Sequence, residues 1–295
     1  MSFLKAGDKI AIIAPSVGLK DKDINPSLNY FKKLKLIPVL ASNLQSEYRY
    51  MAGTDKERAE VTTSLFQDKD VKALFCLRGG AGATRMLPYL NYNIIKKNPK
   101  PVIGLSDSTA LQNALIAKAN IPSFTGFLPI YDLNNKKIDK TIDSSLKNAL
   151  FEDKHQIASG KCQTPGTSEG EIIGGCLSVF LYLCGTPYLP DLSNKILLLE
   201  DTDEKTYKVD LMLNQIKQQK GFNKLKGIII GKFSDCPQID KEDGTIEDCI
   251  KDFTKDLSVP IITDFAYGHI PSRHLIPLGI KVKMCANKNK CILTW

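Results

Sequence analysis

The stretch KPVIGLSDSTALQNALIAKAN, residues 100–120, decides the fold of this chain. Val102 and Ile103 are apolar and β-branched, as expected of a short buried strand. After Ser106, apolar residues recur at helical spacing, at positions 110, 111, 114, 115 and 117. The change from a strand pattern to a helix pattern falls at Ser106. We therefore expect a strand, a sharp turn that carries Ser106, and a helix.

Two interpretations of Ser106 follow from this pattern. In a nucleophile elbow the serine has a strained backbone, and the residues two positions before and after it must be small. Those residues are Gly104 and Ser108 here, whereas the usual pattern G-x-S-x-G has glycine at both places. In the other interpretation Ser106 or Asp107 simply caps the helix, with Thr109 in a polar first turn. This stretch alone favours neither interpretation.

The first half of the chain alternates between strand and helix patterns. Strands are expected at 9–16, 36–42 and 71–77, and helices at 26–34, 56–67 and 83–90, all before the stretch around Ser106. This order predicts an α/β fold with a doubly wound, mostly parallel sheet. Such sheets bind ligands beyond the carboxyl ends of their strands, which is where Ser106 is expected.

Two domains joined by a polar segment are expected. A chain of 295 residues with 43% hydrophobic residues can bury two cores. Residues 132–170 are polar and rich in turn residues, apart from one expected helix at 141–152. We therefore predict an N-terminal domain at 1–135, a linker at 136–168 and a C-terminal domain at 169–295. The C-terminal domain is expected to contain strands at 195–200, 226–233 and 260–265, a helix at 207–220, and a terminal hairpin formed by 275–284 and 291–295.

Composition disfavours several classes of function. The formal net charge is +8, but 35 of the 40 basic residues are lysine. Base and phosphate recognition favours arginine, so we expect a solvated lysine surface with some affinity for anionic substrates and no nucleic acid partner. No apolar run is long enough to span a membrane, and the first residues lack a signal-peptide pattern, so a cytoplasmic protein without a membrane partner is expected. The eight cysteines form no C-x-x-C pair, which predicts reduced, buried thiols, no disulfide and no metal site.

A nucleophilic serine needs a base, and the chain has three histidines. His155 lies in the expected linker, whereas His269 and His274 follow the strand at 260–265. We prefer His269 as the base, because Gly268 and Pro271 fix the backbone around it and its position follows directly from a strand end. The alternative is an ordinary solvated loop histidine.

A catalytic triad also needs an acid that orients the imidazole. Glu200 closes the apolar strand at 195–200, so its carboxylate is expected at the carboxyl end of that strand. The acidic run EDTDE, residues 200–204, can also be interpreted as a calcium loop. It lacks the alternation and the glycine of such loops.

The glycine run LRGGAGAT, residues 77–84, lies between an expected strand and an expected helix. Its backbone N–H groups can converge on a developing negative charge, and we assign an oxyanion hole to the N–H groups of Gly80 and Asp107. The competing interpretation is a dinucleotide-binding loop. That motif requires a third glycine at position 85, where this chain has an arginine. It also requires an acidic residue to bind a ribose, and none lies between Gly79 and Asp107.

Taken in order, several segments of the chain resemble the LD-carboxypeptidases, the muramoyltetrapeptide carboxypeptidase family of serine peptidases. These segments are GDKIAIIAPS (7–16), MAGTDKERA (51–59), LRGGAGATRMLPYL (77–90), IGLSDSTAL (103–111), EGEIIGGCLSVFLYLCGTPYLPD (169–191), ILLLEDTDEKTYKVD (196–210), GIIIGKF (227–233) and YGHIPSRHLIPLGIKV (267–282). The resemblance extends nearly from end to end. It implies a Ser-Glu-His triad, and the motif positions of the family fall on Ser106, Glu200 and His269.

The resemblance also implies an architecture and a substrate. Members of the family have an N-terminal Rossmann-like domain and a C-terminal β-rich α/β domain, with the active site between them, and they are usually homodimers. They act in the bacterial cytoplasm on recycled murein tetrapeptide and remove its terminal D-alanine from an L-centre. The implied partner is a muropeptide substrate, and no metal or cofactor is implied.

This chain departs from the family pattern at three positions. Ala81 stands where tyrosine is common, Cys176 where asparagine follows the paired glycines, and Leu211 where an arginine is often found. Ala81 and Cys176 are expected to shape the cleft and so to affect substrate preference. Arg78 and Arg273 are candidates for binding the terminal carboxylate of the substrate.

Two alternative functions are considered. One, within the same family, is a self-immunity hydrolase of the microcin-resistance type that cleaves a peptide or aminoacyl-nucleotide antibiotic, although the length of 295 residues favours the recycling enzyme. The other is a non-catalytic ligand-binding α/β protein on the same scaffold. Such a protein is expected to lack a member of the triad, and none is missing here.

Overall fold

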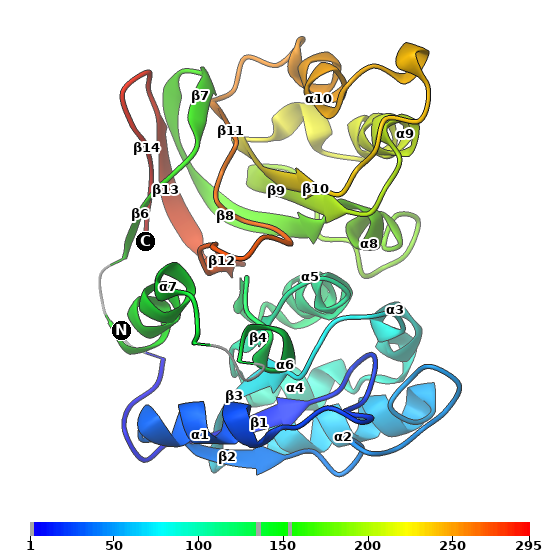
Figure 1. Ribbon diagram of the computed structural model, residues 1–295, viewed down its shortest axis with the longest axis vertical. Helices are drawn as coiled ribbons and strands as arrows, with labels where there is room; N and C mark the ends of the chain where they lie inside the picture. Colours follow the sequence, from blue (N-terminus) through cyan, green and yellow to red (C-terminus); the bar gives the residue numbers. More distant parts are fainter. Residues whose placement is uncertain (1–2, 134–136, 153–154) are drawn as a thin grey trace. The chain divides into compact units, whose positions relative to one another are not determined.

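The computed structural model describes residues 3–133, 137–152 and 155–295. The chain divides into two compact units (Figure 1). The N-terminal unit comprises Met1–Asp153 and His274–Gly279, and the C-terminal unit comprises Lys154–Arg273 and Ile280–Trp295. The boundary expected near residue 135 lies at residues 134–136, outside the described residues.

The N-terminal unit contains a six-stranded sheet in the described part of the chain, in the order β12-β5-β4-β3-β1-β2. Its strands are β1 (Lys9–Ile13), β2 (Ile37–Leu40), β3 (Val71–Cys76), β4 (Val102–Gly104), β5 (Ser123–Thr125) and β12 (Ile276–Leu278). All neighbours are parallel except β12 and β5, which are antiparallel. The five parallel strands have a doubly wound order that reverses between β1 and β3, which is the position at which folds of this class generally bind ligands.

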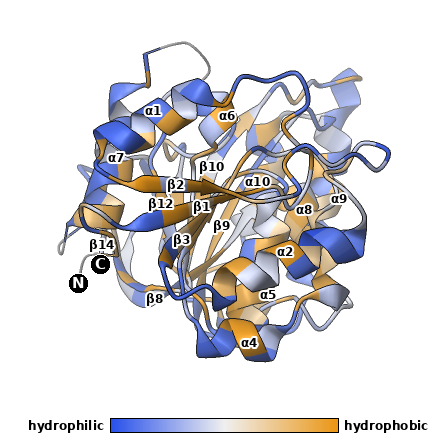
Figure 2. Ribbon diagram, turned by 90° about the horizontal axis from the view of Figure 1, so that it is seen from below, coloured by the Kyte–Doolittle hydropathy of each residue, from blue (hydrophilic) through white to orange (hydrophobic). Residues whose placement is uncertain are grey.

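Helices connect the strands of this unit. They are α1 (Asn25–Lys33), α2 (Asp55–Gln67), α3 (Ala83–Met86), α4 (Tyr92–Lys97), α5 (Ser108–Ala119), α6 (Pro129–Asp132) and α7 (Lys140–Phe151), with a 3-10 turn η1 (Leu87–Tyr89) after α3. Helix α2 starts with a capping box, in which Thr54 accepts from the backbone N–H of Glu57 and the Glu57 side chain accepts from that of Thr54. Figure 2 colours the strands of the sheet mostly as hydrophobic and shows hydrophilic residues on α1, as expected of a sheet covered by amphipathic helices.

The C-terminal unit contains an eight-stranded mixed sheet among the described residues, in the order β6-β14-β13-β8-β9-β10-β11-β7. Its strands are β6 (Gln156–Ala158), β7 (Lys161–Thr164), β8 (Gly166–Cys176), β9 (Lys195–Thr202), β10 (Gly227–Ser234), β11 (Ile261–Thr263), β13 (Lys281–Ala286) and β14 (Cys291–Thr294). The central strands β8 to β11 are parallel, and the outer ones pair antiparallel. The helices are α8 (Leu177–Leu181), α9 (Thr206–Lys217) and α10 (Ile246–Thr254), with 3-10 turns η2 (Phe222–Lys224) and η3 (Lys241–Asp243).

The expected α/β fold, with a parallel-sheet N-terminal part and a β-rich C-terminal part, is confirmed. Three segments differ in detail from the sequence analysis. Helix α7 falls in the segment assigned to the linker and belongs to the N-terminal unit. The turn-rich residues 156–168 form β6, β7 and the start of β8. The terminal hairpin is β13 with β14, whereas 276–278, expected in the same strand as 281–284, pairs with β5 instead.

All eight cysteines are free thiols, four of them buried and four half-buried, so burial is less complete than the composition suggested. None of the helices in the described part of the chain has the length and apolar character that a membrane span requires.

Candidate active site

Ser106 lies in a strained turn between β4 and α5. Its φ is +65°, a left-handed conformation that is uncommon outside glycine. β4 ends at Gly104 and α5 begins at Ser108, so the serine occupies the connection between a parallel strand and a helix. Its side chain is half-buried. Strain at a single serine in such a connection is typical of a nucleophile elbow.

Two glycines leave room for this turn. A Cβ on Gly79, in the loop after β3, would lie 2.9 Å from Cβ and 3.0 Å from Oγ of Ser106. A Cβ on Gly104 would collide with the side chain of Ser108. The small residues that the sequence places around Ser106 are therefore needed for steric reasons.

The structure does not support the capping interpretation of this turn. Asp107 is the N-cap residue of α5, but its side chain caps no N–H group of the helix. Its carboxylate instead accepts hydrogen bonds from the hydroxyl of Ser16, after β1, and from the backbone N–H of Ala83, at 2.8 Å. Burial raises the pKa of the Asp107 carboxyl above 3.8, against the lowering effect of these hydrogen bonds and of the Arg58 charge. The Asp107 side chain thus ties the Ser106 turn to the loops after β1 and β3.

The loop after β3 contains Gly80, whose N–H group the sequence analysis assigned to an oxyanion hole. Gly80 and Gly82 have φ values of +123° and +127°, which residues with a side chain rarely adopt. Gly80 and Ala81 are exposed, whereas Gly82 is buried and directly precedes α3. The backbone of Gly80 is therefore open to a ligand, next to the glycine that contacts Ser106.

In the C-terminal unit, Glu200 and His269 form a hydrogen-bonded pair. Glu200 lies in β9 with a fully buried side chain, and the His269 side chain is 19% exposed. Nδ1 of His269 lies 2.8 Å from Oε2 of Glu200, and the backbone N–H of His269 donates to the same oxygen at 3.2 Å. One carboxylate oxygen therefore holds both the ring and the main chain of His269. With the proton on Nδ1, Nε2 is the basic nitrogen.

Neighbouring residues make room for this pair and support it. A Cβ on Gly268 would lie 2.9 Å from Oε2 of Glu200, and Gly268 has a φ of +128°. The hydroxyl of Ser234, the last residue of β10, donates to the backbone carbonyl of His269 at 3.2 Å. The position of the imidazole is thus fixed by contacts to β9 and to β10.

Burial and pairing have opposite effects on the pKa values of the pair. Burial lowers the pKa of His269, but the hydrogen bond and the charge of Glu200 raise it, and the resulting pKa lies above 6.5. Burial raises the pKa of the Glu200 carboxyl above 4.5, although the hydrogen bond to His269 lowers it. The pair thus favours a proton on the imidazole, as a triad acid does.

Asp201, the residue after Glu200, has a role that the sequence analysis did not assign. It is buried, and its carboxylate accepts hydrogen bonds from the backbone N–H of Ser178 at 2.7 Å and from the thiol of Cys176 at 3.4 Å. It therefore anchors the start of α8 beside Glu200. The available signal was the acidic run EDTDE, residues 200–204, from which the sequence analysis selected only Glu200. Within the described residues, no group of three or more His, Cys, Asp or Glu could hold a metal ion.

The other two histidines lie in different environments. His155 is buried and its ring stacks on Trp295, with ring centroids 4.8 Å apart. His274 is half-buried and belongs to the N-terminal unit, and burial lowers its pKa. His269 is the histidine whose ring hydrogen-bonds to the buried carboxylate of Glu200.

The arginines also differ from one another. Arg273 is fully buried and donates to the carbonyl of Ile270 at 2.7 Å, whereas Arg78 is half-buried and has no hydrogen bond or ion pair within residues 3–133, 137–152 and 155–295. Arg58, which the sequence analysis missed, is fully buried in α2. Arg58 lies in the segment MAGTDKERA, residues 51–59, which the sequence analysis used only for the family resemblance.

The site residues thus form two sets. Ser106, Asp107 and Gly80 lie in the N-terminal unit, and Glu200 and His269 lie in the C-terminal unit. The structure brings together the members of each set.

Both halves of the chain match one protein family. Residues 10–126 match the LD-carboxypeptidase N-terminal domain, and residues 169–284 match the LD-carboxypeptidase C-terminal domain. A Bacillus subtilis protein named "Probable murein peptide carboxypeptidase" is 30% identical over 286 residues, which cover 95% of this chain and 90% of that protein.

Two solved structures are similar over nearly the whole chain. The muramoyltetrapeptide carboxypeptidase from Oxalobacter formigenes has a TM-score of 0.89 at 26% identity, covering 97% of this chain and 98% of that one. The MccF-like protein from Bacillus anthracis has a TM-score of 0.88 at 26% identity, covering 99% and 97%.

The fold and these similarities define a peptidase of the carboxypeptidase class, built from a parallel-sheet unit and a β-rich unit. More specifically, the chain belongs to the LD-carboxypeptidase family. The family resemblance in the sequence is confirmed.

Proposed function

We propose that this protein is a serine-type LD-carboxypeptidase that removes the terminal D-alanine from murein tetrapeptide. The observation that carries the proposal is the backbone of Ser106, held at a φ of +65° between a parallel strand and a helix. A nucleophile elbow explains this strain, whereas a helix cap does not require it. The substrate follows by similarity, from relatives named for murein peptide and muramoyltetrapeptide.

In the proposed reaction, Oγ of Ser106 attacks the carbonyl carbon that precedes the terminal D-alanine. Nε2 of His269 takes the hydroxyl proton and returns it to the leaving amine, while Glu200 orients the imidazole. The backbone N–H groups of Gly80 and Asp107 stabilise the oxyanion of the tetrahedral intermediate. Water then hydrolyses the acyl-enzyme, with His269 again acting as the base. The reaction uses only groups of the chain and one water molecule.

The proposal takes its nucleophile from the N-terminal unit and its acid–base pair from the C-terminal unit, so it requires both. We also propose that the terminal carboxylate of the substrate binds Arg78, whose guanidinium has no partner among the described residues. The setting proposed for this activity is cytoplasmic peptidoglycan recycling by a homodimer.

A second candidate function is self-immunity of the microcin type, in which the same serine cleaves a peptide or aminoacyl-nucleotide antibiotic. The similarity to the MccF-like protein from Bacillus anthracis supports it, at nearly the same TM-score as the Oxalobacter enzyme. The two candidates share the nucleophile and differ in the substrate.

The test is an assay of the purified protein against three compounds. These are a defined murein tetrapeptide, the same peptide without its terminal D-alanine, and an aminoacyl-adenylate analogue. The proposal predicts release of D-alanine from the tetrapeptide alone, with no loss of rate after prolonged dialysis against EDTA. Cleavage of the adenylate analogue instead supports the second candidate. Tetrapeptide hydrolysis that the Ser106→Ala variant retains, or that EDTA abolishes and zinc restores, contradicts the mechanism.

A further inference from the structure

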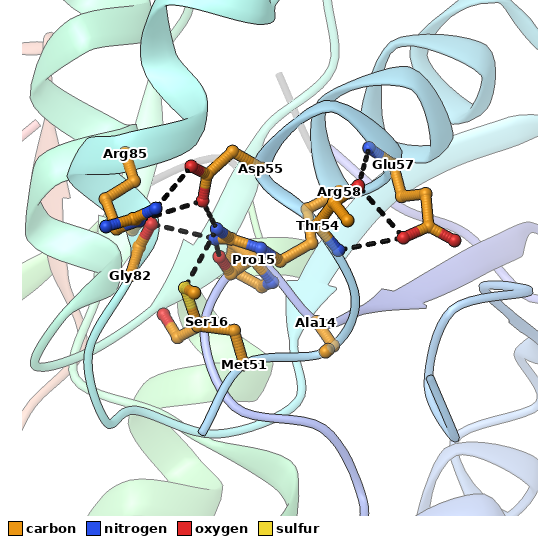
Figure 3. A network of polar contacts seen from close by, with 12 residues as sticks. Ala14, Pro15, Ser16, Met51, Thr54, Asp55, Glu57, Arg58, Gly82 and Arg85 are labelled. Carbon is orange, nitrogen blue, oxygen red and sulfur yellow. Dashed lines mark hydrogen bonds and ion pairs between the residues drawn. The ribbon is translucent and has the colours of Figure 1, made fainter. Parts of the chain in front are cut away.

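A buried arginine connects the loops around Ser106. The guanidinium of Arg58 is fully buried, and it donates from Nη1 to the carbonyl oxygens of Pro15, after β1, and of Gly82, after β3. The bond to Gly82 is 2.7 Å long. Figure 3 shows Arg58 between these two carbonyls. A buried cation is costly unless it is paired and hydrogen-bonded, so this arrangement needs a reason.

The charge of Arg58 is balanced within α2. Nη2 forms an ion pair with Asp55, one turn earlier, and lies 3.1 Å from Sδ of Met51. Asp55 also binds the exposed Arg85, at 2.8 Å to Nη2 and 3.0 Å to Nε (Figure 3). The arginine is thus fixed in one orientation, with Nη1 directed at the two loops.

A second buried charge joins the same two loops. The carboxylate of Asp107 accepts from the hydroxyl of Ser16 and from the backbone N–H of Ala83. Arg58 therefore binds one backbone carbonyl in the loop after β1 and one in the loop after β3. Asp107 binds one hydrogen-bond donor in each of these loops, at the residue that follows the carbonyl bound by Arg58. Gly79 lies against Ser106, and the anchored end of the loop is Gly82. Only two residues, the exposed Gly80 and Ala81, lie between them. This loop contributes few side-chain contacts of its own, so the anchor at Gly82 restricts its conformation.

We propose that Arg58 is a positioning residue for catalysis, which holds the oxyanion loop, residues 79–82, through the carbonyl of Gly82. This inference rests on the proposed function. Arg58 contacts no reacting atom. It fixes the direction of the Gly80 N–H group by fixing the end of the loop. Loss of one oxyanion-hole donor typically reduces kcat by ~10²–10³-fold. A donor that is present but misaligned is also expected to reduce kcat.

The test compares Arg58→Met, which keeps a long buried side chain, with Arg58→Lys, which keeps the charge but loses the planar fork. The matched control is Lys100→Met. Lys100 is also a nearly buried cation that binds two backbone carbonyls, those of Leu65 and Asp68, but at the opposite end of α2. The Arg58 variants and Lys100→Met are all expected to have lower unfolding midpoints than the wild-type protein. All are assayed well below their own midpoints.

The expected result is that Arg58→Met lowers kcat by about 10–100-fold with little change in KM, whereas Lys100→Met keeps kcat within about 2-fold. A tetrapeptide with a phosphinate in place of the scissile amide mimics the tetrahedral intermediate. The affinity of the Arg58 variants for this phosphinate peptide should fall in parallel with their kcat/KM. Hydrogen exchange of the backbone amides at 79–83 should accelerate in the Arg58 variants and not in Lys100→Met. Arg58→Lys is expected to be intermediate.

Several results would overturn the inference. Unchanged kcat and phosphinate affinity in the Arg58 variants would show that Arg58 only stabilises the fold, even if loop exchange accelerated. Equal losses in Lys100→Met would show a general effect of α2. If Arg58→Met does not fold, Ser16→Ala, which removes the hydroxyl bound by Asp107, gives the same readouts for the other half of the anchor. A wild-type protein inactive on all three assay compounds rejects the proposed function itself, and the inference with it.

Discussion

The protonation of His269 sets the pH range in which Ser106 can be activated. A base must be neutral, and the pKa of His269 lies above 6.5 because Glu200 outweighs the effect of burial. kcat/KM should therefore rise with pH through a midpoint above 6.5. In Glu200→Gln, burial still lowers the pKa of His269 but the carboxylate that raises it is gone. The midpoint of the kcat/KM profile should therefore move to lower pH, while kcat falls by about 10⁴-fold. Profiles of kcat/KM against pH check this, and a midpoint that stays or moves upward in Glu200→Gln contradicts the assignment.

Ser106 and His269 should act as one unit. Replacing either residue with alanine is expected to lower kcat by roughly 10⁴–10⁶-fold, and the double variant should be little worse, because each single change already removes the same step. Single-turnover and steady-state rates of the three variants measure this. His274→Ala is the control and should keep nearly full activity. If His274→Ala were inactive and His269→Ala active, the choice of histidine would be wrong.

At the scale of elements, the close approach of the β3 loop to the Ser106 turn is a steric requirement. The added methyl group of Gly79→Ala would lie 2.9–3.0 Å from the Ser106 side chain, so the turn or the loop must shift. A displacement of ~1 Å at a reacting centre can cost ~100-fold in rate, and we expect a loss of about that size in kcat.

Gly170→Ala in β8 is the matched control for Gly79→Ala. Its Cβ would lie 2.9 Å from the carbonyl oxygen of Asn194, an equally close contact in the other unit. Both variants should have lower thermal midpoints, but only Gly79→Ala should lose kcat. Equal kcat in the two variants would show that the β3 loop is not close to the reaction.

For the whole molecule, fragments 1–150 and 151–295 should each be inactive. The proposed nucleophile lies in the first fragment, and the proposed acid and base lie in the second. The first fragment also lacks β12, the strand that covers β5 at the edge of its sheet. D-alanine release by each fragment, with the intact chain as the control, measures this. Full activity in either fragment would reject a triad that takes residues from both units.

Much of the fold follows from local sequence patterns. Strand and helix periodicities located β1, α2, β3, α5, β9 and β10, because these elements are buried on a face or along their whole length and their apolar residues record that burial. The same patterns gave the positions of Ser106, Glu200 and His269 relative to strands, since a strand end is where an apolar run stops. The roles of these three residues came from strand position together with the family resemblance, and they stay predictions.

The tertiary structure alone decided which distant groups meet. The strand at 276–278 pairs with β5 rather than with its sequence neighbours, and 156–168 forms strands rather than a linker, because edge pairing depends on the partner more than on local composition. The hydrogen bond from His269 to Glu200 joins residues 69 positions apart. The anchoring of two loops by Arg58 and Asp107 likewise has no local signature. A buried charge is tolerated only where the fold supplies its partners, and a periodicity cannot show where those partners lie.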